Sequence, residues 1–145
     1  MTEKEFIELV QSDLQNEWTH LQFYLYHASA VNSVHALELK EFLTSAASGE
    51  MQHVQAFLDR LIGVGVKPAH ISGKVFAQHT DPKKILSAAV DLEEEVVKNY
   101  ADRLEQLESL PSTSKIFAAY FTIFYEDQLQ DSYEDCEKIR NLLRS

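Results

Sequence analysis

The feature that most constrains this chain is a set of four long segments in which apolar residues recur every three or four positions. This spacing is typical of α-helices that bury one face. The segments cover residues 7–31, 39–61, 86–107 and 119–143. With only four glycines and three prolines in 145 residues, the chain has few positions at which a helix has to stop. We therefore expect an all-α fold of four long helices.

The connections between these segments differ in length. Asn32 and Ser33 separate the first two segments, and residues 110–114 separate the last two, so each pair is expected to form a hairpin. Periodicity is lost from Gly63 to about Asp81, and an extended chain of that length can run along a bundle, because it covers about 3.3 Å per residue against 1.5 Å in a helix. Asp81 and Pro82 form a typical helix start. The expected architecture is a four-helix bundle of two helical hairpins joined by a long crossover, with no fifth helix, in one domain spanning residues 1–145.

Charge and cysteine content exclude several classes of protein. The formal net charge is −10 and the sequence pI is about 5.0, which disfavours binding to nucleic acid or to an anionic membrane surface. The single cysteine, Cys136, excludes an internal disulfide and a cysteine-based metal cluster. No apolar run approaches the roughly 18 residues of a membrane span, and the N-terminus does not resemble a signal peptide. We expect a soluble cytoplasmic protein.

Acidic residues interrupt each of the four apolar stripes. Glu17 lies in the first stripe, and Glu50, with His53 three residues later, lies in the second. In the third stripe Glu93 is favoured over Glu94 and Glu95, because its neighbours three and four positions away are alanine and valines. In the fourth stripe the interrupting residue is Glu126. The same number of residues separates Glu17 from Glu50 and Glu93 from Glu126, as two equivalent hairpins would require.

Four buried carboxylates need a positive partner. An ionised carboxylate in a low-dielectric core is costly unless it is paired or binds a cation, and four of them would repel one another. Glu50 and His53 lie on one helix face, since positions i and i+3 are neighbours, so both can bind one ion. Carboxylate oxygens with one imidazole suit iron or manganese better than structural zinc. The sequence therefore predicts two bridged metal ions, although a Glu-x-x-His pair is also common by chance on helix surfaces.

These motifs resemble those of the ferritin-like superfamily, and most closely those of bacterioferritins and ferritins. Asn16 and Glu17, followed by Tyr24, are similar to the family's first helix, and the run Glu50, Met51, Gln52, His53 matches its second helix. Glu93 and Glu126 correspond to the carboxylates of its third and fourth helices. The resemblance covers nearly the whole chain, from about Leu14 to Leu143.

The resemblance implies a ligand set for two iron ions, for which manganese or zinc can substitute. Glu17 and Glu93 would be terminal ligands on separate irons, Glu50 and Glu126 would bridge them, and His53 would bind one of them. Tyr24 would be catalytic, either as a hydrogen-bond partner of a bridging carboxylate or as a one-electron donor to bound oxygen. The alternative for Tyr24 is a core tyrosine with a satisfied hydroxyl.

The chain departs from the bacterioferritin pattern in the fourth helix. Leu129 stands where bacterioferritins have the second histidine, three residues after the carboxylate. Ferritins without that histidine use a glutamine in the same helix, which makes Gln128 an alternative ligand, with Asp127 as a further choice. The residues downstream of Gln128 are polar, so we favour the register in which Glu126 faces inward. The second iron would then lack an imidazole.

The remaining candidates concern haem and the other histidines. Met51 lies where bacterioferritins have the methionine that ligates a shared haem, although a methionine on a helix is more often a packing residue. His20 also lies three residues after a glutamate, but we expect it to be peripheral. The other histidines are expected on the surface or in loops; they are His27, His35, His70 and His79.

The resemblance implies an iron protein that oxidises Fe(II) to Fe(III) at a di-iron centre with dioxygen or peroxide, with or without iron storage. One alternative is a di-iron oxidoreductase similar to the peroxide-reducing rubrerythrins, although the paired Cys-x-x-Cys motif of their electron-transfer domain is missing here. The other alternative is a metal-free four-helix binding module. We expect a homo-oligomer, at least a dimer through the face of the first two helices, with no nucleic acid and no membrane as partners.

Overall fold

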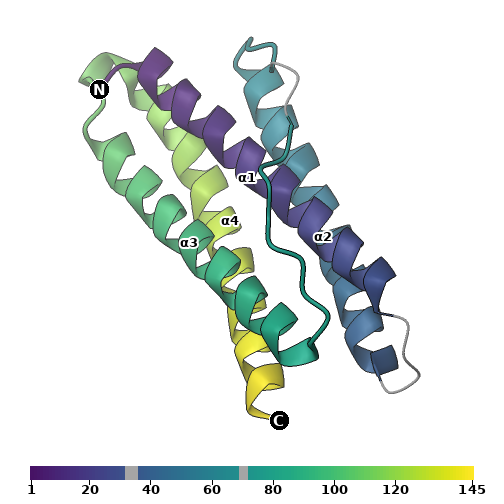
Figure 1. Ribbon diagram of the computed structural model, residues 1–145. Coiled ribbons are helices and arrows are strands. Elements are labelled where there is room, and N and C mark those ends of the chain that lie inside the picture. The colour runs from purple at the N-terminus through teal and green to yellow at the C-terminus, as the bar shows by residue number, and fades with distance from the viewer. Residues whose placement is uncertain (32–35, 69–71) are drawn as a thin grey trace. The chain divides into compact units, whose positions relative to one another are not determined.

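The structure is a computed structural model that describes residues 1–31, 36–68 and 72–145 (Figure 1). These residues form four α-helices and one short 3-10 helix, with no strand among them. The helices are α1 (Glu3–Ala30), α2 (Leu37–Gly63), α3 (Pro82–Glu108), η2 (Ser112–Ser114) and α4 (Lys115–Arg144). The expectation of four long helices is confirmed. Within the described part of the chain, no helix has both the length and the apolarity needed to cross a membrane.

The chain divides into two compact units, each of which contains one helical hairpin. The first unit, Gln11–Ile85, holds most of α1, all of α2 and the crossover, and we call it the first hairpin. The second unit, Met1–Val10 with Leu86–Ser145, holds most of α3, all of α4 and the start of α1, and we call it the second hairpin. The two pairings expected from the lengths of the connections are thus present.

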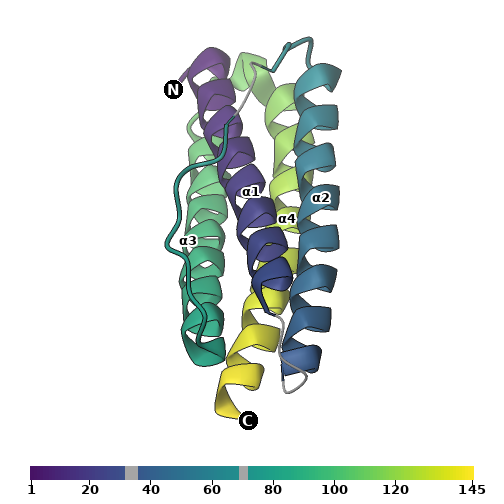
Figure 2. The same ribbon diagram turned by 45° about the vertical axis from the view of Figure 1, so that its right-hand side comes forward.

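The first hairpin has an apolar core between α1 and α2 and an anchored crossover. Its buried apolar side chains include Leu14, Leu21, Tyr24, Leu43, Phe57 and Leu61. The crossover runs beside α1 (Figure 2) and is bound to it by side chains. Gln15 Nε2 donates to the carbonyl oxygen of Ser72 over 3.0 Å, and the backbone N–H of Lys74 donates to Thr19 Oγ1 over 2.8 Å. These hydrogen bonds satisfy backbone groups in a segment that has no regular structure of its own.

The second hairpin is held together mainly by aromatic rings. Phe6, from the first turns of α1, contacts Phe121 and Tyr125 of α4 with ring centroids 5.4 and 5.9 Å apart. Tyr125 in turn contacts Tyr100 of α3 at 5.4 Å. Edge-to-face contacts of this kind add about 0.5–1.5 kcal/mol each beyond the area that they bury. The rings therefore set which face of α4 is turned inward.

This aromatic packing corrects the predicted register of α4. Ala119, Ile123 and Tyr133, which were predicted on the buried stripe, are exposed. The buried residues of the described helix are Phe121, Phe124, Tyr125, Gln128, Ser132, Cys136 and Ile139. The large rings bury more apolar area than Ile123 and Leu129 would, so the helix is rotated toward them.

Candidate metal centre

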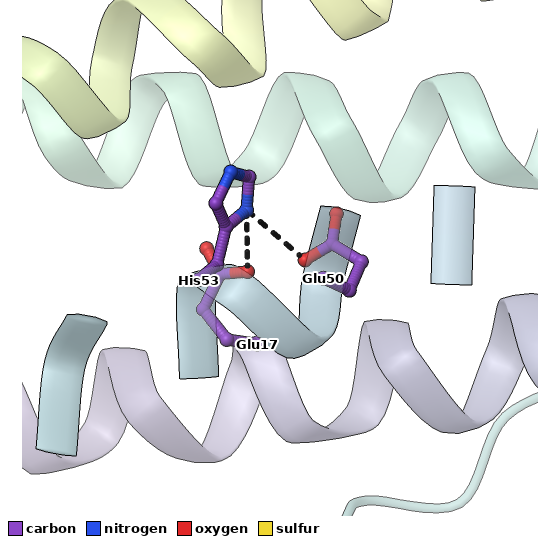
Figure 3. Close-up of side chains that lie close together, drawn as sticks. All are labelled: Glu17, Glu50 and His53. Carbon is purple, nitrogen blue, oxygen red and sulfur yellow. Dashed lines mark hydrogen bonds and ion pairs between the residues drawn. The ribbon is translucent and has the colours of Figure 1, made fainter. Parts of the chain in front are cut away.

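Two carboxylates and an imidazole converge inside the first hairpin. Glu17 extends from α1, and Glu50 and His53 extend from α2 (Figure 3). His53 Nδ1 lies 3.3 Å from Glu17 Oε2 and 3.4 Å from Glu50 Oε2. All three side chains are buried, with exposed fractions of 1%, 2% and 7% for Glu17, Glu50 and His53. The predicted ligands of the first two helices are thus brought together.

The spacing of these atoms fits a common metal ion. Two donors that each lie about 2.1 Å from one ion at right angles are about 3 Å apart, close to the separations seen here. Carboxylate oxygens only accept hydrogen bonds. The Nδ1 atom of His53, which faces both carboxylates, therefore needs either a proton or a shared metal ion between itself and these oxygens. The three groups therefore form a site that a cation completes, and a set of carboxylates with an imidazole suits iron or manganese.

The electrostatics of Glu17 agree with a site for a cation. Burial is the strongest influence on this carboxyl group and by itself raises its pKa. The hydrogen bonds with Glu50 and His53 and the positive charges of His53 and His20 outweigh burial and lower the pKa of Glu17 to about 2. Glu17 is therefore ionised at neutral pH and can act as a metal ligand without losing a proton.

The prediction for α3 is confirmed as far as burial is concerned. Glu93 is 1% exposed, whereas Glu94 is exposed and pairs with Arg140 of α4. Tyr24 of α1 is buried as well, at 1% exposure. Met51 is 59% exposed, so its thioether can be reached from outside the chain. Haem binding by Met51 stays a prediction.

The prediction that Glu126 faces inward is wrong. Glu126 and the further candidate Asp127 are exposed on α4, and Gln128 is buried in their place. Ser132, four residues after Gln128, is also buried, although Asp131 is exposed and Asp135 is half-buried, so Gln128 and Ser132 face the interior from a stripe whose other downstream residues are polar. Gln128 Oε1 and Ser132 Oγ have no hydrogen-bond partner among residues 1–31, 36–68 and 72–145. Buried polar atoms of this kind carry a cost that often has a functional reason.

Two histidines that we expected at the surface are buried. His20 is 4% exposed, and the expectation that it is peripheral is wrong. The signal that could have identified it is its position three residues after Glu17, on the same helix face. His27 is fully buried under the crossover, while His79 is half-buried within it. His35 and His70 lie outside the described residues.

The burial of His27 was not predicted because the crossover residues that cover it are distant in sequence. Its Nδ1 lies 2.8 Å from the carbonyl oxygen of Phe23, which can only accept, so this nitrogen carries the proton. Its Nε2 accepts a hydrogen bond from the backbone N–H of His79 over 3.2 Å. The ring also contacts Phe76 of the crossover, with centroids 5.9 Å apart. His27 is thus a neutral structural histidine.

Comparison with known proteins identifies the family of this chain. The ferritin-like domain model of the Ferritin family matches residues 7–139. A crystal structure of ferritin-like, diiron-carboxylate proteins from Bacillus anthracis str. Ames superimposes with a TM-score of 0.82, at 26% sequence identity, over 97% of this chain and 96% of that one. No curated protein sequence matches significantly. With its all-α fold, its two hairpins and its buried carboxylates and histidine, this chain belongs to the ferritin-like domain family and has a ferritin-like four-helix bundle fold.

Proposed function

We propose that this chain oxidises Fe(II) to Fe(III) at a carboxylate–histidine centre, with dioxygen or peroxide as the oxidant. The observation that carries the proposal is the convergence of Glu17, Glu50 and His53 at 3.3–3.4 Å inside the first hairpin. The similarity to a structure described as a diiron-carboxylate protein supports iron as the metal.

The chemistry assigned to these residues is binding and charge balance. Two Fe(II) ions each give up one electron to one dioxygen molecule, which takes up two protons from solvent and becomes hydrogen peroxide. With peroxide as the oxidant, the same two electrons and two protons yield two water molecules. Carboxylates favour the ferric product, because they offset its additional positive charge in a buried site. Ions about 3.5–4 Å apart can deliver both electrons to one oxidant.

Further residues are proposed from their burial and from the family resemblance. Glu93 is proposed as an iron ligand because of its burial and the family resemblance. In α4 we propose Gln128 in place of Glu126, since its side chain is the buried one. Tyr24 is proposed as the electron donor or as the hydrogen-bond partner of a ligand. The acidic surface, with its net charge of −10, favours the approach of Fe(II).

The test is aerobic addition of Fe(II) to the purified chain. Formation of Fe(III) is followed by its ultraviolet absorbance, and size-exclusion chromatography is followed by counting iron per chain in each peak. The proposal predicts faster oxidation than in protein-free buffer and about two irons per chain, as a two-metal site requires. Oxidation at the rate of buffer alone, with no iron in the protein peak, contradicts it.

The same experiment decides between catalysis alone and storage. A small oligomer that carries about two irons per chain would contain catalytic sites and no iron store. A large particle with many more irons per chain is a storage assembly. We propose at least a dimer, formed through the face of α1 and α2; Leu25 of α1 and Met51 of α2 are exposed apolar side chains. Elution as a monomer contradicts this part of the proposal.

A further inference from the structure

The first hairpin contains two Glu-x-x-His motifs. Glu50 and His53 form the motif of α2, and Glu17 and His20 form the same spacing on α1. We infer that His20 is a second imidazole ligand of the metal centre, supplied by α1, and that it replaces the histidine that α4 lacks at Leu129. This inference rests on the proposed function, because it assigns a ligand of that same centre.

The antiparallel arrangement of α1 and α2 brings the two motifs together crosswise. Because the two helices run in opposite directions, moving three residues toward the C-terminus of α1 corresponds to moving three residues toward the N-terminus of α2. His53 therefore faces Glu17, at 3.3 Å, while His20 faces Glu50, with its ligand nitrogen within 4.8 Å of a Glu50 carboxylate oxygen. Each imidazole thus meets the carboxylate of the other helix.

Glu50 is the residue that the two imidazoles share. His53 Nδ1 lies 3.4 Å from Glu50 Oε2, and His20 lies within reach of the same carboxylate. A carboxylate has two oxygens and can bind two ions at once. A carboxylate within reach of two imidazoles, one from each helix, is the arrangement expected when it bridges two ions and each ion has its own histidine.

His20 is placed for this role by its burial and its distance from Glu50. Its side chain is only 4% exposed, so it is held inside the hairpin and is not a mobile surface group. Its ligand nitrogen lies within 4.8 Å of a Glu50 carboxylate oxygen, and Glu50 in turn belongs to the cluster with Glu17 and His53. A metal ion that binds the imidazole would neutralise these carboxylates without any protonated histidine.

The pair of imidazole ligands is then complete without a histidine from α4. Ferritin-like di-iron proteins take two Glu-x-x-His motifs from two helices. Here both motifs come from α1 and α2, whereas Leu129 of α4 is half-buried and cannot bind a metal. The second imidazole ligand is therefore supplied by α1 instead of α4, and the centre should hold two ions with one histidine each.

The experiment uses the full chain loaded with Co(II), which binds such sites without being oxidised by air under mild conditions. Proton NMR counts the exchangeable imidazole N–H signals that paramagnetic Co(II) shifts far downfield, one for each bound histidine. Two such signals are expected in the wild-type protein, and a single signal there overturns the inference. This readout needs no variant and no catalytic turnover.

Variants then assign the signals. His20→Gln keeps a polar side chain of similar length and should remove one signal and weaken Co(II) binding at least tenfold, since even the loss of an outer-shell partner costs about 10–100-fold. His53→Gln should remove the other signal. His79→Gln, a histidine outside the cluster, should change neither. If His20→Gln does not fold, as judged by circular dichroism, His20→Leu provides the same count. Two signals that persist in the His20 variant overturn the inference.

Failure of this inference is distinguishable from failure of the proposed function. If wild-type protein oxidises Fe(II) and the His20 variant keeps every imidazole signal and its Co(II) affinity, only the role of His20 is wrong. If the wild-type protein shows both signals and yet oxidises no Fe(II), the proposed oxidation is wrong and His20 remains a metal ligand.

Discussion

The two hairpins differ in what their second helices bury. In the first hairpin, α2 buries Glu50 and His53, a carboxylate and an imidazole that face the buried Glu17 of α1. In the second hairpin, α4 buries the neutral polar groups of Gln128 and Ser132 among aromatic rings. An ionised cluster in a core needs a cation, whereas a core of rings is stable without one. The comparison teaches that the buried face of α2 needs a cation, whereas the buried face of α4 serves mainly packing; in the second hairpin it is the buried Glu93 of α3 that we propose as a ligand.

The largest effect expected is the loss of iron oxidation in Glu50→Ala. This substitution removes the carboxylate that lies near both His20 and His53, and with it the charge that offsets the metal ions. We expect the rate of Fe(II) oxidation to fall at least about 100-fold, the upper end of what the loss of a supporting group causes. The rate is measured by the absorbance of Fe(III) after anaerobic loading and exposure to air.

The matched control is Glu126→Ala, which removes a carboxylate from the exposed face of α4. It should leave the oxidation rate within about twofold of wild type, because an exposed carboxylate is already solvated. If Glu126→Ala lowered the rate as strongly as Glu50→Ala, α4 would hold part of the charged site and the comparison of α2 with α4 would fail.

The next largest effect is on stability and concerns the rings of the second hairpin. Phe121 is fully buried and contacts Phe6 at 5.4 Å, so Phe121→Ala should lower the free energy of unfolding by about 3–5 kcal/mol. Ile123→Ala, two residues further along and 60% exposed, should change it by no more than about 0.5 kcal/mol. Both values come from urea denaturation. Equal values for the two variants would contradict the observed register of α4.

A smaller effect of opposite sign is expected for Gln128→Leu. Gln128 Oε1 is buried and has no hydrogen-bond partner among the described residues, so removing it relieves a desolvation cost of about 1–3 kcal/mol. The metal-free variant should therefore be more stable than wild type in urea denaturation. If Gln128 binds iron, the same variant should oxidise Fe(II) more slowly. A variant that is less stable and oxidises iron normally would show that the amide serves packing alone.

The buried faces of three of the four helices could be predicted from sequence because their apolar stripes are continuous. Glu17, Glu50, His53 and Glu93 interrupt rows of apolar residues, and periodicity alone identified each as interior. The start of α3 was also correct, since the backbone N–H of Lys84 donates to Asp81 Oδ2 over 3.2 Å. Local patterns were sufficient wherever one face of a helix was clearly more apolar than the others.

The buried face of the fourth helix could not be predicted in this way because the helix has two apolar faces. Ile123 and Leu129 define one stripe and Phe121 and Tyr125 define another, and the polar residues downstream of Gln128 favoured the first. Contacts with Phe6 and Tyr100 select the second, and these partners are distant in sequence. Tertiary packing decided between two registers that local periodicity leaves nearly equal.

The histidines were misjudged for a related reason. We treated the buried stripe of α1 as one row, but a helix that packs against a neighbour buries a face about 100° wide, which includes His20 beside Glu17. His27 is covered by the crossover, and a segment without periodicity gives no indication of which helix it will lie against. The errors thus lie where contacts join segments that are far apart in the chain.

The smallest effect expected is a pH dependence in the first hairpin that does not arise from the metal centre. Burial lowers the pKa of His27 from its ordinary value of 6.5, with His79 acting in the same direction and the hydrogen bond to Phe23 opposing it. Because the folded chain holds His27 neutral, its contribution to stability is complete above pH 6.5 and declines as the pH falls below that value. His27→Phe should cost about 1–2 kcal/mol near neutral pH, through the lost hydrogen bonds, and should flatten this decline in metal-free protein. An unchanged slope between wild type and His27→Phe, measured by urea denaturation across this range, would show that protonation of His27 does not loosen the crossover.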